Sequence, residues 1–187
     1  MPNWCSNFIT LKHKDPAMIE RAIKAFENES FLNEFIPCPE PLKEASAPNR
    51  DTESAHELRA KYGYSDWYSF QITEWGTKWD IGSGEVTIVD PNTIDVPFDS
   101  AWSPPCTAYE KLVGMGFEIK AYYDEPGMAF CGVWQGTSEE DYSDEYHEYG
   151  GEDSSTVRDV IGEELDDFWC ISERMADMEE ESEDDEE

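Results

Sequence analysis

The sequence predicts an α+β protein built around an antiparallel β-sheet. Three observations carry this prediction: short alternating runs typical of strands, helical stretches bounded by capping residues, and turn signals between consecutive runs. The length of 187 residues fits one compact domain with an insertion. Because the hydrophobic share is 39% and the aromatic share is 13%, a core can form and a wholly disordered chain is excluded.

The chain begins with a predicted strand and helix. Residues 7–13 alternate and are rich in β-forming side chains. Asp15 and Pro16 then provide an N-cap and a proline at the first helical position. The apolar residues from Ile19 to Phe26 recur at helical spacing, so a helix of about three turns is expected.

Residues 29–84 are predicted to be an insertion of irregular and helical structure. The three prolines within residues 37–41 predict an extended segment. Residues 51–63 and 65–76 each combine capping residues at the start with a glycine at the end, so each predicts a short helix.

The rest of the body predicts four strands and one helix. The strands are expected at residues 85–89, 93–98, 117–123 and 128–134. Pro97 suggests an edge strand or a bulge, and residues 103–114 predict the helix. The order of elements over residues 1–136 therefore contains β-α-β-β-α-β, which is the ferredoxin-like, split βαβ arrangement, with the insertion at 29–84.

The acidic residues are concentrated in the last third of the chain. Residues 1–120 hold 19 acids and 11 bases, whereas residues 121–187 hold 25 acids and two bases, Arg158 and Arg174. The total formal charge is −31. Because phosphate contacts need a basic surface, this charge argues against direct binding to nucleic acid or to an anionic membrane.

Two further segments are predicted after the body. Residues 137–174 are expected to form an acidic loop, over 137–155, and then one amphipathic helix, because apolar residues from Val157 to Trp169 recur at three- and four-residue steps. Residues 175–187 hold nine acids and predict a disordered acidic tail. The N-terminus lacks the features of a signal peptide, and no stretch has the length of a membrane span, so a cytoplasmic protein is expected.

Four landmarks carry a resemblance to a known family. They are MPNWCSN at residues 1–7, WGTKWD at 75–80, WSPP at 102–105 and YDEPGM at 123–128. In this order they resemble the YubB-like family of phage and conjugative-plasmid proteins with a ferredoxin-like domain. The resemblance covers roughly residues 1–135. It implies the fold, a mobile-element origin and the cytoplasm of a bacterial host, and it brings no catalytic or cofactor residues.

No catalytic, cofactor or metal site is predicted. The five cysteines lie 25 or more residues apart and the three histidines are isolated, which is unlike a zinc site. No nucleophile elbow or phosphate-binding loop occurs. Cys131 paired with His13 or His56 is conceivable, but Cys131 lies in an apolar strand, where cysteine acts as a small hydrophobe. We therefore expect a non-enzymatic protein.

Residues 75–80 have two interpretations. Trp75, Lys78 and Trp79 can form a pocket, which gives the alternative function of a small ligand-binding or enzymatic domain. In the second interpretation both tryptophans pack on the sheet and Gly76 ends a helix. A further alternative is a structural accessory protein that self-associates through residues 156–172.

The leading hypothesis assigns binding to the acidic segment. A helical stretch with this density of carboxylates approaches the charge spacing of duplex DNA, so it can occupy a basic site on a host nucleic-acid-handling or defence protein. A merely solubilising tail is the alternative. The predicted partner-binding residues are Glu139, Glu140, Asp141, Tyr142, Asp144, Glu145, Tyr146, Glu148, Tyr149, Glu152, Asp153, Glu163, Glu164, Asp166 and Asp167.

Overall fold

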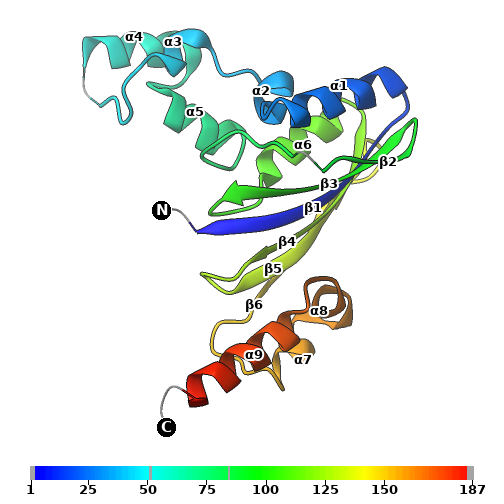
Figure 1. Cartoon of the computed structure of the whole chain (residues 1–187). Helices are drawn as coiled ribbons and strands as arrows, with labels where there is room; N and C mark the ends of the chain where they lie inside the picture. The colour runs from blue at the N-terminus through cyan, green and yellow to red at the C-terminus, as the bar shows by residue number, and fades with distance from the viewer. Residues whose placement is uncertain (1–2, 51, 84, 185–187) are drawn as a thin grey trace.

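The frame of the molecule is a mixed α/β structure with an open antiparallel sheet (Figure 1). The computed structural model describes residues 3–50, 52–83 and 85–184. Within these residues the sheet has six strands in the order β2-β3-β1-β4-β5-β6. The strands are β1 (Trp4–His13), β2 (Thr87–Asp90), β3 (Thr93–Ala101), β4 (Phe117–Glu125), β5 (Phe130–Gly136) and β6 (Ser143–Glu148).

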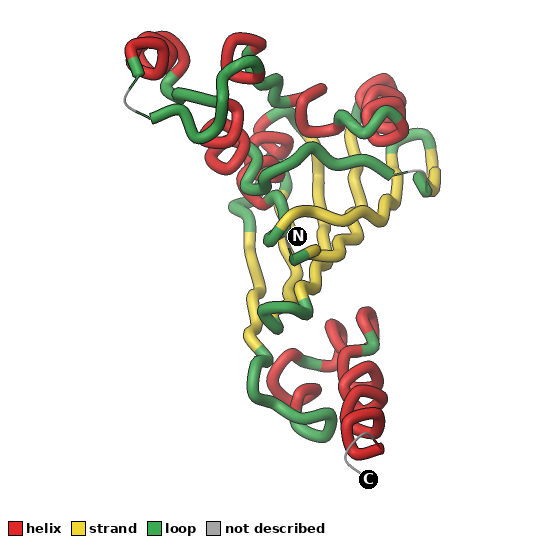
Figure 2. The backbone as a smooth tube through the Cα atoms, turned by 60° about the vertical axis from the view of Figure 1, so that its left-hand side comes forward, coloured by secondary structure: helices red, strands yellow, loops and turns green. Residues whose placement is uncertain are grey.

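Helices lie on both faces of the sheet, and Figure 2 shows the two groups separated by it. The first group is α1 (Pro16–Glu27), α2 (Phe31–Phe35), α3 (Glu40–Lys43), α4 (Glu53–Tyr62), α5 (Trp67–Glu74) and α6 (Cys106–Gly114). The second group is α7 (Val157–Ile161), α8 (Glu163–Trp169) and α9 (Ile171–Asp184). We call the sheet surface under the first group the upper face and the other surface the lower face.

Strand β1 lies at the centre of the sheet and divides its side chains between the two faces. Ile9 and Leu11 are fully buried in the main core, together with Ile19 and Phe26 of α1. Phe8, which precedes Ile9 on the strand, is only half-buried, because it points to the lower face. Period-two alternation therefore places one apolar face under α1 and α6 and leaves the other partly open.

The local capping signals predicted for the first helices are confirmed. The side chain of Asp15 accepts a hydrogen bond from the backbone N–H of Ala17 at the start of α1. Thr52 and Asp66 cap α4 and α5 in the same way. These bonds satisfy amide groups that have no partner within a helix. Residues 37–41 were predicted to be extended. The end of this segment instead forms the single helical turn α3.

The prediction that Pro97 marks an edge strand is wrong for β3 as a whole, because β3 lies between β2 and β1. However, β2 pairs with β3 only from Thr93 to Asp95. Pro97 lies beyond this pairing, where the outer side of β3 has no ladder partner among the described residues. The missing N–H of proline is therefore tolerated locally.

Three predictions for the C-terminal third are wrong. The predicted loop at residues 137–155 contains β6, which pairs with β5 from Phe130 to Gln135. The single amphipathic helix is divided into α7, α8 and α9, because Gly162 and Cys170 adopt positive φ angles of 84° and 51°. The predicted disordered tail, residues 175–187, instead continues α9 to Asp184, while residues 185–187 lie outside the described residues.

The second group of helices has its own small core on the lower face. Cys131 and Val133 of β5 pack with Val157, Ile161 and Leu165, and Tyr149 and Ile171 complete this C-terminal core. A buried ion pair fixes α9 to the sheet: Arg174 Nη1 donates to Asp124 Oδ2 of β4 over 2.8 Å. The side chain of Asp124 is 2% exposed, so this carboxylate depends on Arg174 for its charge partner.

We predict that Arg174→Met lowers the free energy of unfolding by about 2–4 kcal/mol, because it leaves the Asp124 carboxylate buried without its cation. Urea denaturation of the purified protein measures this change. Lys43→Met is the matched control, since the Lys43–Glu40 pair is a surface i,i+3 pair and its loss costs about 0.5 kcal/mol or less. Equal effects of the two substitutions would contradict the prediction.

Candidate functional site

Both arginines of the acidic third form ion pairs within the chain, Arg158 inside the C-terminal unit, residues 137–184, and Arg174 with the sheet. Arg158 forms ion pairs with Glu163 at 3.0 Å and with Asp166 and Asp167 at 2.8 Å each. The hydrogen bonds that Arg158 donates to Asp167, Asp166 and Glu163 raise the pKa of Arg158 above its usual range. Arg174 pairs with Asp124, as described above. Arg158 therefore offsets part of the charge of α8, and the surface carboxylates that form no ion pair stay uncompensated.

Asp166 was predicted to contact a partner, and this prediction is wrong. Its side chain is 2% exposed and accepts hydrogen bonds from the backbone N–H and the hydroxyl of Ser172 at 2.7 and 2.8 Å. Asp166 thus caps the start of α9. Although burial alone would raise the pKa of Asp166, the bonds from Ser172 and Arg158 lower it below its usual value.

Tyr149 was predicted as an aromatic anchor for a partner, and this prediction is also wrong. The residue is 5% exposed, and its hydroxyl donates to Asp124 Oδ1 over 2.7 Å. Arg174 Nη2 donates to the same hydroxyl over 3.2 Å. Burial, and then the bond to Asp124, raise the pKa of Tyr149 far above its usual value. Tyr149 is part of the attachment of the C-terminal unit.

The other two predicted tyrosine anchors remain at the surface. Tyr142 is 53% exposed and stacks on Trp134 with ring centroids 5.5 Å apart. Tyr146, on the outermost strand β6, is 49% exposed and lies 5.5 Å from the ring of Phe130. Each tyrosine ring is already held by a neighbouring aromatic side chain. It can therefore contact a partner with little further loss of conformational entropy.

Most of the predicted carboxylates are exposed, and some have internal hydrogen bonds. Glu139 lies 3.3 Å from Lys14, and Glu164 lies 2.9 Å from Lys120. Asp144 accepts from Tyr123. The exposed members are Glu139, Glu140, Asp141, Asp144, Glu145, Glu148, Glu152, Asp153, Glu163, Glu164 and Asp167. They come from the loop before β6, from β6 itself, from the loop after it and from α8.

Helix α9 adds carboxylates that the sequence prediction placed in a disordered tail. Glu173, Asp177, Glu180 and Glu181 are exposed, and no described residue forms an ion pair or a hydrogen bond with their side chains. Ile171 and Met175, one helical turn apart, pack on the C-terminal core. This i,i+4 pair, continued by good helix formers, is the signal in the sequence that could have identified the helix. We call the exposed acids of residues 137–182 the acidic surface.

The tryptophans of residues 75–80 have different environments. Trp75 is 1% exposed, and its indole N–H donates to the carbonyl of Ile36 over 2.9 Å, so the core interpretation is confirmed for this residue. It is wrong for Trp79, which is 38% exposed. No cavity described here is lined by Trp75 together with Trp79.

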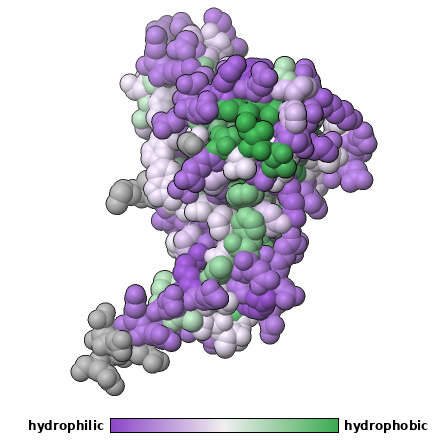
Figure 3. Space-filling model, turned by 45° about the vertical axis from the view of Figure 1, so that its right-hand side comes forward, coloured by the Kyte–Doolittle hydropathy of each residue, from purple (hydrophilic) through white to green (hydrophobic). Residues whose placement is uncertain are grey.

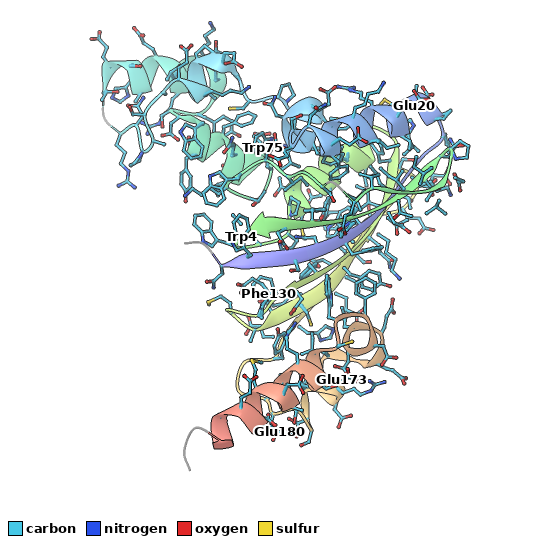
Figure 4. All side chains as sticks on the ribbon, in the orientation of Figure 1. Trp4, Glu20, Trp75, Phe130, Glu173 and Glu180 are labelled. Carbon is cyan, nitrogen blue, oxygen red and sulfur yellow. The ribbon has the colours of Figure 1, made fainter. Side chains whose placement is uncertain are left out.

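Trp79 instead belongs to an exposed cluster, which we call the aromatic patch: Trp4, Lys78, Trp79 and Trp102. The rings of Trp4 and Trp79 lie 5.7 Å apart. Lys78 Nζ lies 4.6 Å from the ring of Trp79 and 5.2 Å from that of Trp102. Trp4 and Trp102 are 48% and 40% exposed. Figure 4 shows Trp4 at the N-terminal end of β1.

Other potential sites are limited. Among the described residues, no three His, Cys, Asp or Glu side chains are grouped so that they could hold a metal ion. Cys131 is fully buried, and burial, followed by the charge of Asp124, raises the pKa of its thiol to about 12. None of the helices described has the length and apolar character needed to cross a lipid bilayer.

Comparisons with known proteins do not identify a family for this chain. No protein-family model matches the chain, and no curated protein matches it. One solved structure that is similar is the protein api92 from Yersinia pseudotuberculosis, described with the family model DUF1281. It is 12% identical over 81% of this chain and 99% of its own, with a TM-score of 0.48.

We predict that Asp166→Asn destabilises the protein by about 1–3 kcal/mol at pH 7, because a buried carboxylate loses its charge-assisted bonds. The folded-state pKa of Asp166 lies below its usual value, so its contribution is complete above the usual carboxyl value of about 3.9 and is lost as the pH falls through the lower folded-state pKa.

Urea midpoints measured between pH 7 and pH 2 should therefore converge for the wild-type and Asp166→Asn proteins at the acid end. Asp141→Asn, an exposed substitution, serves as the control and should change little at any pH. A difference that stays constant down to pH 2 would contradict the assignment of Asp166 as an ionised cap.

Proposed function

We propose that this chain is a non-enzymatic binding protein whose acidic surface occupies a basic site on a nucleic-acid-handling or defence protein. One observation carries the proposal: the C-terminal unit is folded and exposes many carboxylates, while Arg158 and Arg174 are both engaged internally. The surface thus keeps an uncompensated negative charge in a defined shape, which favours encounter with cationic protein surfaces.

The spacing of charge along α9 supports this function. The helix holds seven acids in 14 residues. At the rise of an α-helix this is roughly one acid per 3 Å, close to the spacing of phosphates along one strand of duplex DNA, roughly 3.4 Å. A basic groove can meet the acids that share one face of this helix, such as Glu173, Asp177 and Glu181, which follow one another at four-residue steps.

The aromatic patch supplies a second kind of contact on the same side of the molecule. The backbone N–H of Trp102 donates to Asn3, and Asn3 lies against Gly127 in the turn between β4 and β5. Figures 1 and 2 show that the N-terminal end of β1 and the C-terminal end of α9 are on one side. Tryptophan is enriched at binding hot spots, so the patch can give shape specificity to a partner attracted by charge.

We also infer that the body has the ferredoxin-like arrangement. The order β2-β3-β1-β4, with antiparallel neighbours, supports it, as do α1 after β1 and α6 between β3 and β4. Strands β5 and β6 extend this arrangement. The proposed origin in a phage or plasmid, and with it the bacterial cytoplasm, continues to depend on the resemblance to the YubB-like family.

The first test neutralises α9. We predict that the variant Glu173→Gln, Asp177→Asn, Glu180→Gln, Glu181→Gln binds a nona-arginine peptide at least about tenfold more weakly than wild type at 150 mM salt, because four surface charges are lost. Fluorescence anisotropy measures the affinity. Capture from cells of the source organism should lose the same basic partner.

The matched control changes four exposed acids of the body, Glu20, Glu27, Glu53 and Glu57, to glutamine. It has the same net charge as the α9 variant. If the two variants bind nona-arginine equally, affinity depends only on total charge, and the acidic surface has no special role. Capture of no basic protein by wild type would count against the proposed partner.

The second test concerns the aromatic patch. We predict that Trp79→Ala weakens binding of the captured partner by about 2 kcal/mol or more, mainly through faster dissociation, while nona-arginine binding is unchanged. Surface plasmon resonance separates the two rates. Tyr68→Ala removes an aromatic ring of similar exposure from α5 and should have little effect. Equal losses for the two variants would exclude a specific hot spot.

A further inference from the structure

A groove crosses the part of the lower face that the second helix group leaves open. It has a volume of about 600 Å³ and lies between β1 and β3 on one side and α8 on the other. The residues that matter here are Phe8, Ser83, Glu85, Asp99, Phe168 and Trp169, and we call it the β3 groove. Its volume is within the range of sites that bind small molecules or single side chains.

The β3 groove exists because β2 is short. Strand β2 pairs with β3 only as far as Asp95, so the outer edge of β3 from Val96 onward is free of a paired strand among the described residues. Figure 3 shows an apolar band on this side of the molecule that continues down to the C-terminal unit. The segment around Ser83 forms the far wall.

One wall of the groove is aromatic. Phe168 of α8 stacks on Tyr122 with centroids 4.2 Å apart and planes 7° apart, and its centroid lies 5.4 Å from that of Phe8 in a T-shaped arrangement. Trp169 lies perpendicular to Phe168 at 5.0 Å. Phe168 remains 38% exposed although one of its faces is covered by Tyr122. The ring is therefore held in place and still open to a ligand.

The charged residues of the groove have one sign. Asp99 and Glu85 line it, and no lysine or arginine belongs to its described lining. Asp99 Oδ1 accepts a hydrogen bond from Ser6 over 3.0 Å, which orients the carboxylate on the strand. Asp99 Oδ2 accepts none from the described residues. A carboxylate and a partly exposed aromatic ring that line one groove are a combination that recognises a flat organic cation.

We propose that the β3 groove binds the guanidinium group of an arginine side chain. A guanidinium is planar and carries several N–H groups, so it can stack on the exposed part of Phe168 and donate to Asp99, which both line the groove. An ammonium can reach the carboxylate but cannot stack in this way. The identification of a partner as the source of the arginine rests on the proposed function, whereas binding of the group itself does not.

The acidic surface adjoins the groove. Phe168 and Trp169 follow Glu163, Glu164 and Asp167 on the same short helix α8. Because these three acids are paired with Arg158 and Lys120, the charge that attracts a basic chain comes from the unpaired acids of the acidic surface. The β3 groove would then select arginine over lysine among the cations that the acidic surface collects.

The test uses the full chain and three small probes: Nα-acetyl-arginine amide, Nα-acetyl-lysine amide and Nα-acetyl-citrulline amide. Citrulline keeps the shape of arginine without its charge. Amide and indole N–H chemical shifts are followed by NMR. We expect saturable binding of the arginine probe, with shifts centred on Trp169 and Asp99, and binding of the other two at least about fivefold weaker.

Two substitutions complete the test. Asp99→Asn should weaken the arginine probe about fivefold, while Asp95→Asn, which removes the same charge four residues earlier on β3 and outside the groove, should not. Phe168→Leu should remove the preference for arginine over lysine. Citrulline binding equal to arginine, equal effects of Asp99→Asn and Asp95→Asn, or shifts confined to α9 would each overturn the proposal.

This experiment separates the two proposals. The probes carry one charge and need no partner protein, so failure here leaves the test of the acidic surface unaffected. Conversely, if neutralising α9 changes nothing while the arginine probe binds the groove, the guanidinium site stands and only its assignment to a basic partner is lost.

Discussion

The contact between Asp124, Arg174 and Tyr149 holds the acidic third on the body. Asp124 belongs to the sheet, Tyr149 to the loop after β6, and Arg174 to the last helix. A buried carboxylate is costly to leave without a partner, so α9 cannot detach without exposing or isolating that charge. The C-terminal core around this contact is small. The attachment of the C-terminal unit to the sheet therefore depends strongly on the hydrogen bonds among Asp124, Arg174 and Tyr149.

The same arrangement determines the electrostatics of the surface. In residues 121–187 two arginines face 25 acids, and both are used for internal bonds. Self-repulsion among the remaining acids opposes compaction, and the protein limits it by distributing them over a loop, an edge strand and two helices. A folded scaffold of this kind presents charge in fixed positions, which is what distinguishes a recognition surface from a solubilising tail.

Two apolar features accompany the acids. The aromatic patch lies at the N-terminal end of β1, and the β3 groove lies on the lower face where β2 stops. Both arise because the sheet is incompletely covered: short β2 frees an edge of β3, and the second helix group covers only part of the lower face. Exposed aromatic side chains beside an intensely charged surface provide contacts that charge alone cannot, since screened electrostatics has little shape selectivity.

Elements whose signals are local could be predicted from the sequence. Asp15, Thr52 and Asp66 predict helix starts because a cap acts within three residues, and the alternation in β1 and β4 predicts strands because each has one buried face. The excess of acids near the C-terminus was equally visible, and most of the predicted acidic residues are indeed exposed.

Strands and side chains whose roles depend on residues distant in the sequence could be assigned only once the fold was known. Strand β6 lacks an apolar face of its own and forms because the edge of β5 offers it backbone partners. Asp166 and Tyr149 resemble their exposed neighbours in sequence, yet Arg158, Ser172 and Asp124 make them structural. The neighbouring sequence does not show whether a carboxylate or a tyrosine is buried, because its role depends on which charge or donor the fold brings next to it.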